Sequence, residues 1–378
     1  MRIGLLVLSV GEFGNKGFYN LQEVGLGKAF GNDGHTVEIY KCVHKSKAGR
    51  TEEIAPNVTL HLIGANTLGN NAMFSCEKQL DRNLDVLVCF SDIQFWTTKV
   101  CKWAERNQIL FIPYVGITHS TSPSLLKRGL INLLARSVFR TYRKTGALAK
   151  TGTIEKELIA KGITDVRTVH VGIDFDLLHR DYDVPKQALL NELGLTPGLQ
   201  YMLMVGRIES DRNPLDVVTV LDRLHQNNRN FRLIVIGKGS LKEALFASLS
   251  EKGLSDCVVY IPQVPNADIW KYYRAADALL SFSRTEIFGM SILEAMYYEL
   301  PVFVIHAPGP DEIVIDGETG RLVDSPEDMA QAVLAERAGD IGKNGHRHVA
   351  LHFSWSGMVN AVVEKAGTDD LSGRYENK

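Results

Sequence analysis

The chain has 378 residues, of which 45% are hydrophobic and 23% charged, a composition typical of soluble globular proteins. This composition excludes disordered and collagen-like chains, and the absence of any run of about 18 apolar residues excludes a membrane-spanning helix. The net charge of −2 excludes a global attraction to nucleic acid or anionic membranes. The length predicts about two domains, each large enough for its own core.

Short apolar runs alternate with longer amphipathic stretches along the chain, which predicts βα units on largely parallel sheets. The first run, in MRIGLLVLSV, lacks a small-residue cleavage site and is expected to form a buried strand rather than a secretory signal. The strands predicted in the first half are 3–9, 36–40, 58–63, 85–90, 109–115 and 166–171. Those predicted in the second half are 201–206, 231–236, 257–261, 277–282 and 301–305. Each half therefore has enough strands for a doubly wound sheet, so the predicted fold class is α/β with two Rossmann-like domains.

A stretch rich in Asp, Gly and Pro at 172–200 indicates the region that links the two domains. We place the first domain at 1–178 and the second at 179–353, and we expect a C-terminal helix over 354–378 to pack back on the first domain.

Five cysteines are scattered along the chain without a CxxC or CxxH spacing: Cys42, Cys76, Cys89, Cys101 and Cys257. An odd and scattered set indicates reduced thiols and therefore a cytoplasmic protein.

The segment 125–150 is strongly basic, with seven Lys and Arg residues and no Asp or Glu, interleaved with leucines. One interpretation is a solvated helix face over an ordinary core contact. The other is a surface for a membrane or an anionic acceptor.

Four loops of the second half each follow a predicted strand, at the edge where open parallel sheets bind ligands. In the first loop, VGRIESDRNP, Gly206 permits a tight turn, and Arg207 and Arg212 form a pair of cations suited to a diphosphate. In the second loop, Gly237 and Gly239 leave backbone free to approach a ligand, although a lone GxG is weak support.

The third loop, around Val264, offers main-chain groups that could pair with a nucleobase. In the fourth, Glu286 is followed by Phe288, Gly289 and Met290, where a predicted helix begins with its free N–H groups at the sheet edge. Glu294 lies just over one turn into that helix, close enough to accept hydrogen bonds from a diol.

These motifs resemble the retaining glycosyltransferases of family four, which have the GT-B fold of two Rossmann-like domains facing a central cleft. The most specific feature is S-x-x-E-x-F-G-x-x-x-x-E-A, with its two glutamates eight positions apart. The resemblance extends over nearly the whole chain and includes VGR at 205–207, GKG at 237–239 and GPDEIVIDGETGRLV.

The resemblance implies roles for individual residues. Arg207 and Arg212 would hold the diphosphate of a nucleotide sugar, Glu294 the ribose hydroxyls, and Glu286 the sugar. The backbone at Phe288, Gly289 and Met290 would bind sugar and phosphates. In the first domain, which would bind the acceptor, His119 would face the sugar across the cleft, and Gly17 would begin a glycine loop that closes on the phosphates.

Four positions depart from the family pattern, and none removes a charge that the chemistry needs. The unusual residues are Arg212 in place of Lys, Phe18 in place of a second glycine, Glu299 in place of a helix-ending glycine, and Pro308 in place of a glycine.

Two further motifs are given structural interpretations. The pairs Asp174/Asp176 and Asp181/Asp183 imitate a metal-binding DxD, but a solvated linker is the preferred interpretation. The glycines of GxGxxxG at 25–31 are ascribed to close helix packing.

We therefore expect a metal-independent, retaining hexosyltransferase that uses a UDP- or GDP-sugar as co-substrate and needs no cofactor. Its acceptor would be a saccharide, a lipid-linked group or a small molecule, in polysaccharide or other glycoconjugate biosynthesis. The protein would be cytoplasmic, with peripheral contact to the inner face of the membrane through 125–150, and would have no nucleic-acid partner. A sugar-nucleotide epimerase of similar fold and a non-catalytic nucleotide-sugar-binding protein are the alternatives.

Overall fold

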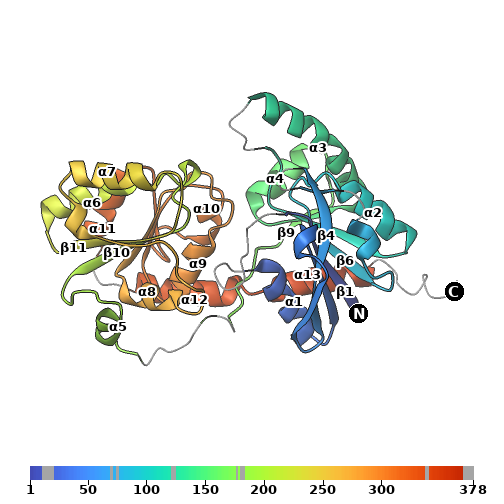
Figure 1. Cartoon of the computed structure of the whole chain (residues 1–378), viewed down its shortest axis with the longest axis horizontal. Coiled ribbons are helices and arrows are strands. Elements are labelled where there is room, and N and C mark those ends of the chain that lie inside the picture. Colours follow the sequence, from blue (N-terminus) through green and yellow to red (C-terminus); the bar gives the residue numbers. More distant parts are fainter. Residues whose placement is uncertain are drawn as a thin grey trace. The chain divides into compact units, whose positions relative to one another are not determined.

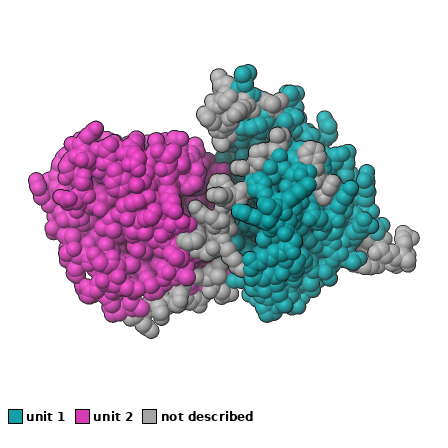
Figure 2. Space-filling model, in the orientation of Figure 1, with its two compact units in different colours: residues 1–15, 21–172, 355–378 teal, residues 16–20, 173–354 magenta. Residues whose placement is uncertain are grey.

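The computed structural model describes residues 1–10, 21–68, 71–73, 76–120, 125–175, 178, 184–336 and 340–368. Contacts divide the described chain into two units, coloured separately in Figure 2. Unit 1 runs to Gly172 and resumes at Trp355, and unit 2 spans Ile173–Ser354. These boundaries lie at 172 and 354, where the sequence analysis places them at 178 and 353. The last described helix, α13 (Ser356–Thr368), lies in unit 1 and contacts α1 (Gln22–Asn32).

Unit 1 is built on a sheet with the order β3-β4-β2-β1-β6-β7-β8-β9, and β5 pairs with β4. Its strands are β1 (Arg2–Val7), β2 (Thr36–His44), β3 (Arg50–Ala55), β4 (Val58–Leu68), β5 (Asn71–Met73), β6 (Val86–Phe90), β7 (Leu110–Val115), β8 (Ala147–Ala149) and β9 (Val166–Thr168). β3 and β5 run antiparallel to β4, and the other pairs are parallel. Apolar runs do not predict β3, β5 or β8, because these strands are either polar or only three residues long.

The other helices of unit 1 are α2 (Thr97–Arg106), α3 (Leu125–Thr145) and α4 (Gly152–Ala160). The glycines of α1 explain how this helix approaches the sheet. A Cβ on Gly27 would press against Ile39 and Val58, and one on Gly31 would press against Val58 and Pro56. Close helix packing is therefore the correct interpretation of these glycines.

Unit 2 contains a parallel sheet with the order β12-β11-β10-β13-β14-β15. Its strands are β10 (Gln200–Val205), β11 (Phe231–Ile236), β12 (Val258–Ile261), β13 (Ala278–Ser281), β14 (Val302–Ile305) and β15 (Arg321–Val323). Its helices are α5 (Lys186–Glu192), α6 (Asp216–Asn227), α7 (Lys242–Glu251), α8 (Ile269–Ala275), α9 (Met290–Tyr297), α10 (Pro310–Ile313), α11 (Pro326–Ala335) and α12 (Ile341–His352). Figure 1 shows helices on both faces of this sheet, which is why its central strands are apolar runs rather than alternating ones.

All five cysteines are buried and free, as their spacing predicts. Four of them belong to unit 1, and three of these four lie on its sheet or on α2. Burial raises the pKa of the Cys89 thiol well above its ordinary value, so this thiol is protonated and poorly nucleophilic.

Candidate functional site

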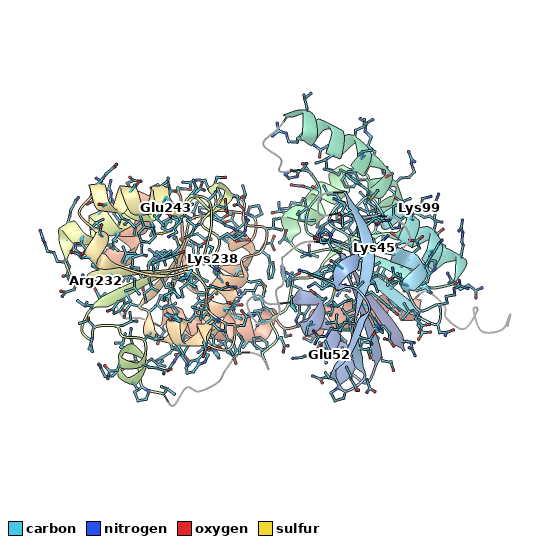
Figure 3. All side chains as sticks on the ribbon, in the orientation of Figure 1. Lys45, Glu52, Lys99, Arg232, Lys238 and Glu243 are labelled. Carbon is cyan, nitrogen blue, oxygen red and sulfur yellow. The ribbon has the colours of Figure 1, made fainter. Side chains whose placement is uncertain are left out.

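The strand order of unit 2 reverses between β10 and β13. From β10 the chain proceeds outward through β11 and β12, then returns to place β13 on the other side of β10. β10 and β13 are therefore neighbours whose following connections lead to opposite sides of the strand order. Open α/β sheets bind ligands at the carboxyl edge of such a pair of strands. Arg232 and Lys238, labelled in Figure 3, mark the start of β11 and the residues just after its end, so the carboxyl edge is that of Lys238.

Two glycines in the loop after β11 permit close contact with the loop after β10. A Cβ on Gly237 would overlap the carbonyl oxygen of Gly206, and one on Gly239 would overlap the backbone of Ile208. Hydrogen bonds from Gly206 N to Ile236 O (3.0 Å) and from Ile208 N to Lys238 O (2.8 Å) join the same segments. These glycines thus serve the packing of one loop on another. The approach of a ligand to their backbone stays a prediction.

Four charged side chains meet at the switch point. The Arg207 guanidinium lies 2.6 Å from the Asp211 carboxylate, and Arg212 Nε lies 3.7 Å from the same oxygen. Arg212 also contacts the carboxylate of Glu286, which is only 16% exposed. The structure therefore brings together three predicted site residues, Arg207, Arg212 and Glu286.

Arg212 is the more buried of the two arginines. Its burial lowers the pKa of the guanidinium, and the nearby Asp211 carboxylate opposes that shift. Because a guanidinium stays protonated throughout the range of protein chemistry, Arg212 is a permanent cation with limited hydration. Such a group is suited to bidentate hydrogen bonding with phosphate.

Hydroxyl and amide groups connect the loop after β10 to the loop after β13. Ser283 Oγ donates to Asp211 O (2.9 Å), and Thr285 Oγ1 donates to the same oxygen (3.2 Å). Asn213, in the left-handed region with φ 45°, donates from its amide to Phe282 O (3.1 Å). The arginines and Glu286 thus lie on two loops that are held to each other.

Two further hydrogen bonds join the loop after β11 to the loop after β10. The backbone and hydroxyl of Ser240 both donate to the Glu209 carboxylate, at 2.9 and 2.6 Å. These two hydrogen bonds lower the pKa of the Glu209 carboxyl, so it remains ionised well into the acidic range.

The segment after Glu286 turns sharply into α9. Gly289, with φ +96°, precedes Met290, the first residue of the helix, and Phe288 is buried. Gly309, in the loop after β14, approaches so closely that a Cβ on it would overlap the backbone of Phe288, and its N–H donates to Glu286 O (2.8 Å). The start of α9 is therefore fixed at the carboxyl edge.

Glu294 lies on the second turn of α9, partly buried. It accepts a hydrogen bond of 2.8 Å from the hydroxyl of Tyr273, on α8. Burial of Tyr273, together with the Glu294 charge, raises the pKa of this phenol well above its ordinary value, so it stays a donor at all moderate pH values. Tyr273 thereby orients the carboxylate.

Val264, the residue predicted to contact the nucleobase, lies three residues after the end of β12. Val264 is 9% exposed, and the preceding Gln263 accepts a hydrogen bond of 3.1 Å from Lys238 in the loop after β11. The contact of the Val264 backbone with a nucleobase stays a prediction.

His119 lies in unit 1, four residues after the end of β7. Its side chain is 58% exposed, and Nδ1 lies 3.5 Å from the Glu157 carboxylate, which also accepts from Thr118. Its proposed approach to a sugar stays a prediction. Gly17 and Phe18 lie outside the described residues.

The sequence analysis is wrong about Asp174. This residue is 6% exposed and therefore buried rather than in a solvated linker, while Asp176, Asp181 and Asp183 lie outside the described residues. Nowhere in the described ranges do three His, Cys, Asp or Glu side chains gather in a way that could hold a metal ion. The described helices also include none that is long and apolar enough to span a bilayer.

Sequence reasoning missed several residues that hold the site. They are Glu209, Asp211, Asn213, Ser283 and Tyr273. The first three lie inside the motif VGRIESDRNP and could have been noticed as polar residues next to the arginines. Tyr273 comes from a distant helix and carries no local signal.

Comparison with known proteins finds a family match in unit 2. Residues 186–340, nearly all of unit 2, match the family described as Glycosyl transferases group 1, which confirms the resemblance that the motifs indicate. The chain is similar to the D-inositol 3-phosphate glycosyltransferase of Segniliparus rotundus, with 32% identity over 47% of this chain and 42% of that protein. It is also similar to the alpha-monoglucosyldiacylglycerol synthase of Acholeplasma laidlawii, with 29% identity over 42% of this chain and 41% of that protein. The chain thus spans less than half the length of these curated relatives.

Solved structures extend the likeness to both units. Sucrose-phosphate synthase from Thermosynechococcus elongatus has a TM-score of 0.74 at 18% identity, covering 99% of this chain and 98% of that one. Anabaena HepE in complex with UDP and glucose has a TM-score of 0.72 at 14% identity, covering 97% of this chain and 100% of that one. These likenesses confirm the predicted GT-B class of two parallel-sheet α/β domains.

Proposed function

We propose that the protein is a retaining glycosyltransferase that moves a hexosyl sugar from a nucleotide diphosphate sugar to an acceptor in glycoconjugate biosynthesis. The observation that carries this proposal is the meeting of Arg207, Arg212 and Glu286 at the switch point of the unit 2 sheet. Two arginines beside a partly buried glutamate combine diphosphate binding with a carboxylate for a sugar. The family match over the same unit supports the reaction class.

The chemical problem is the leaving diphosphate, whose negative charge grows as the glycosidic bond breaks. Hydrogen-bond donors are in place before the nucleotide sugar binds: Arg207, Arg212 and the N–H groups at the start of α9. Preorganised donors of this kind stabilise charge that develops in the transition state without having to reorganise. This supports catalysis without a metal ion.

Glu286 and Glu294 have different proposed roles. Glu294, held by Tyr273, accepts hydrogen bonds from the ribose diol, and Glu286 lies beside the sugar, where its charge favours an oxocarbenium-like state. The acceptor attacks the face that the diphosphate leaves, so the anomeric configuration is retained. His119 contacts the sugar from the acceptor domain.

The donor is a UDP- or GDP-sugar. Because HepE is described in complex with UDP-glucose, UDP-glucose is the first donor to test. The names of the curated relatives include a glycosyltransferase for an inositol phosphate and a synthase for a glycolipid, which supports a polyol or lipid acceptor.

We propose a peripheral membrane contact through α3. Its C-terminal half is packed, with Ala135, Val138 and Tyr142 buried, whereas three leucines of the N-terminal half are exposed: Leu126 (87%), Leu133 (52%) and Leu134 (45%). Figure 1 shows this end of α3 extending beyond the sheet of unit 1. Exposed leucines beside Arg128, Arg136 and Arg140 are suited to an anionic lipid surface.

A thermal-shift panel of UDP-, GDP-, ADP- and TDP-sugars tests donor binding, because a bound ligand raises the melting temperature by mass action. The donor that shifts it is then incubated with polyol and lipid acceptors, and NMR of the product gives its anomeric configuration. A panel without any shift contradicts the proposed function. Turnover of the donor to an isomer without acceptor favours the epimerase, and an inverted product contradicts retention.

A further inference from the structure

Asp211 lies between the two arginines proposed to bind the diphosphate, and the family pattern gives it no role. Its carboxylate oxygen is 2.6 Å from Arg207 and 3.7 Å from Arg212, and the side chain is 45% exposed. It is thus an anion at the place where the phosphates of a donor would bind.

Two hydrogen bonds hold the backbone of Asp211 in place. Its carbonyl oxygen accepts from both Ser283 and Thr285, and Ser283 is itself buried. The Asp211 carboxylate is therefore attached to a fixed backbone and pairs with Arg207, four residues earlier in the chain. It holds the Arg207 side chain in one orientation before a donor binds.

The same carboxylate repels a diphosphate. Phosphate oxygens would accept hydrogen bonds from the same guanidinium N–H groups that donate to Asp211. Two anions that share one cation repel each other, so each weakens binding of the other. Glu286 acts similarly on Arg212, but as a sugar ligand it also interacts favourably with the donor. Asp211 has no such compensation, since its neighbours are the two arginines and the loop that holds it.

We propose that Asp211 is a positioning residue that competes electrostatically with the diphosphate. It keeps Arg207 ordered before the donor binds and weakens binding of the nucleoside diphosphate product, so that the product is released quickly. This inference rests on the proposed function, because it requires that Arg207 and Arg212 bind the donor's phosphates.

The test is Asp211→Asn, which keeps the size and the hydrogen-bonding capacity of the side chain and removes the charge. Isothermal titration with UDP, or with GDP if guanine nucleotides bind more tightly, is expected to show an affinity about three- to tenfold higher than that of the wild type. The gain is expected to fall from the diphosphate to the monophosphate and to vanish for the nucleoside. It is also expected to shrink as salt rises from about 0.02 to 0.5 M. Steady-state product inhibition by the diphosphate becomes correspondingly stronger.

Asp216→Asn is the matched control. Asp216 is an aspartate of the same segment that pairs with Arg284 at 3.0 Å, and neither Arg207 nor Arg212 is its partner in the ion pairs of the described residues. This variant is expected to bind as the wild type does. Asp211→Ser, which also lacks the charge, repeats the measurement if the asparagine variant is unstable.

The outcomes separate this inference from the function on which it rests. Equal or weaker diphosphate binding by Asp211→Asn overturns the competition, and a gain that is the same for nucleoside and diphosphate does so as well. If the wild type binds no nucleoside diphosphate at all, the proposed function fails and the inference falls with it.

Discussion

Glu286 and Glu294 have the same side chain but different partners, and the partners suit them to different roles. Glu286 contacts the cation Arg212, whereas Glu294 accepts from the neutral phenol of Tyr273. The charge of the carboxylate near Arg212 is compensated by that guanidinium before any donor binds. The carboxylate on α9 accepts from the Tyr273 hydroxyl, and a carboxylate can accept several hydrogen bonds at once, so it can also accept from a diol.

This difference predicts distinct phenotypes for the same substitution. Glu294→Gln should weaken binding of both the free nucleoside diphosphate and the sugar donor by about 1.5–3 kcal/mol, the contribution of a hydrogen bond to a charged group. Glu286→Gln should not weaken diphosphate binding and should lower kcat instead, since its interaction strengthens as charge develops on the sugar. Titration with bare nucleotide followed by turnover measurements provides both numbers. The reverse pattern would mean that the two roles are exchanged.

Glu299 provides a stability prediction. It occupies the residue after the C-cap of α9 with φ +61°, a left-handed conformation that favours glycine. Hydrogen bonds from Glu299 N to Met296 O and from Leu300 N to Ala295 O, each 3.0 Å, complete a Schellman motif. The departure from the family's glycine therefore leaves a strained residue at this turn.

Glu299→Gly should raise the free energy of unfolding by about 0.5–1 kcal/mol, because relief of the left-handed strain exceeds the added entropy of the unfolded chain. Glu299→Ala is the control, since it removes the carboxylate and keeps the strain. Chemical denaturation checks both variants. An alanine variant as stable as the glycine variant would attribute the gain to the charge and not to the backbone.

At the scale of elements, the loops after β10 and β11 act as a pair. The overlap that a Cβ would cause differs sharply between two glycines with similar backbone angles: Gly237 (φ +153°) would collide with Gly206 O, whereas Gly206 (φ +145°) has nothing within 4 Å of its Cβ position.

Gly237→Ala should therefore destabilise the protein by about 1–3 kcal/mol more than Gly206→Ala, since both variants strain the backbone and only one forces the loops apart. Thermal and chemical denaturation of the two variants measure the difference. Equal losses would show that the close approach of the two loops contributes nothing to stability.

The helix α3 has two different halves, and its exposed half predicts membrane binding. Flotation with anionic liposomes should fall about tenfold or more in the triple variant Leu126→Ser, Leu133→Ser and Leu134→Ser, because burial of leucine side chains in the interface is lost. Replacing Arg128, Arg136 and Arg140 with Gln should abolish the preference for anionic over neutral lipid. Leu351→Ser in unit 2, where the leucine is 69% exposed, is the control. Equally weak binding of the wild type to both lipids would restore the solvated-face interpretation.

At the scale of the whole molecule, the proposed functional residues are distributed over two α/β units. Unit 2 holds the arginines and glutamates of the proposed donor site, and unit 1 holds His119 and the basic helix. The two arginines at the carboxyl edge of unit 2 provide a prediction for the effect of removing metal ions.

Transfer activity should survive an excess of EDTA, because Arg207, Arg212 and the start of α9 neutralise the leaving diphosphate. Initial rates with and without chelator check this, with a metal-dependent glycosyltransferase as the positive control for chelation. Complete loss of activity that Mg²⁺ or Mn²⁺ restores would count against the proposed mechanism and direct attention back to Asp174 and Asp176.

The sequence by itself determined the fold class, most of the central strands and the candidate residues Arg207, Arg212 and Glu286, which the structure brings together. Buried parallel strands must be continuous apolar runs, and residues just after such strands must share one edge, so both features leave local patterns along the chain. The motif around Glu286 and Glu294 sufficed to indicate the family, because its spacing depends on a single loop and the helix that follows it.

Only the tertiary structure decided which partners those residues have. The contact of Arg212 with Glu286, the hydrogen bond from Tyr273 to Glu294 and the burial of Asp174 depend on segments that are separated in sequence. The glycines at 237 and 239 were visible in the sequence, but their reason, an approaching backbone, was not. Side-chain partners are set by how loops pack across the edge of a sheet, and that packing depends on contacts between residues far apart in the chain, which local periodicity does not encode.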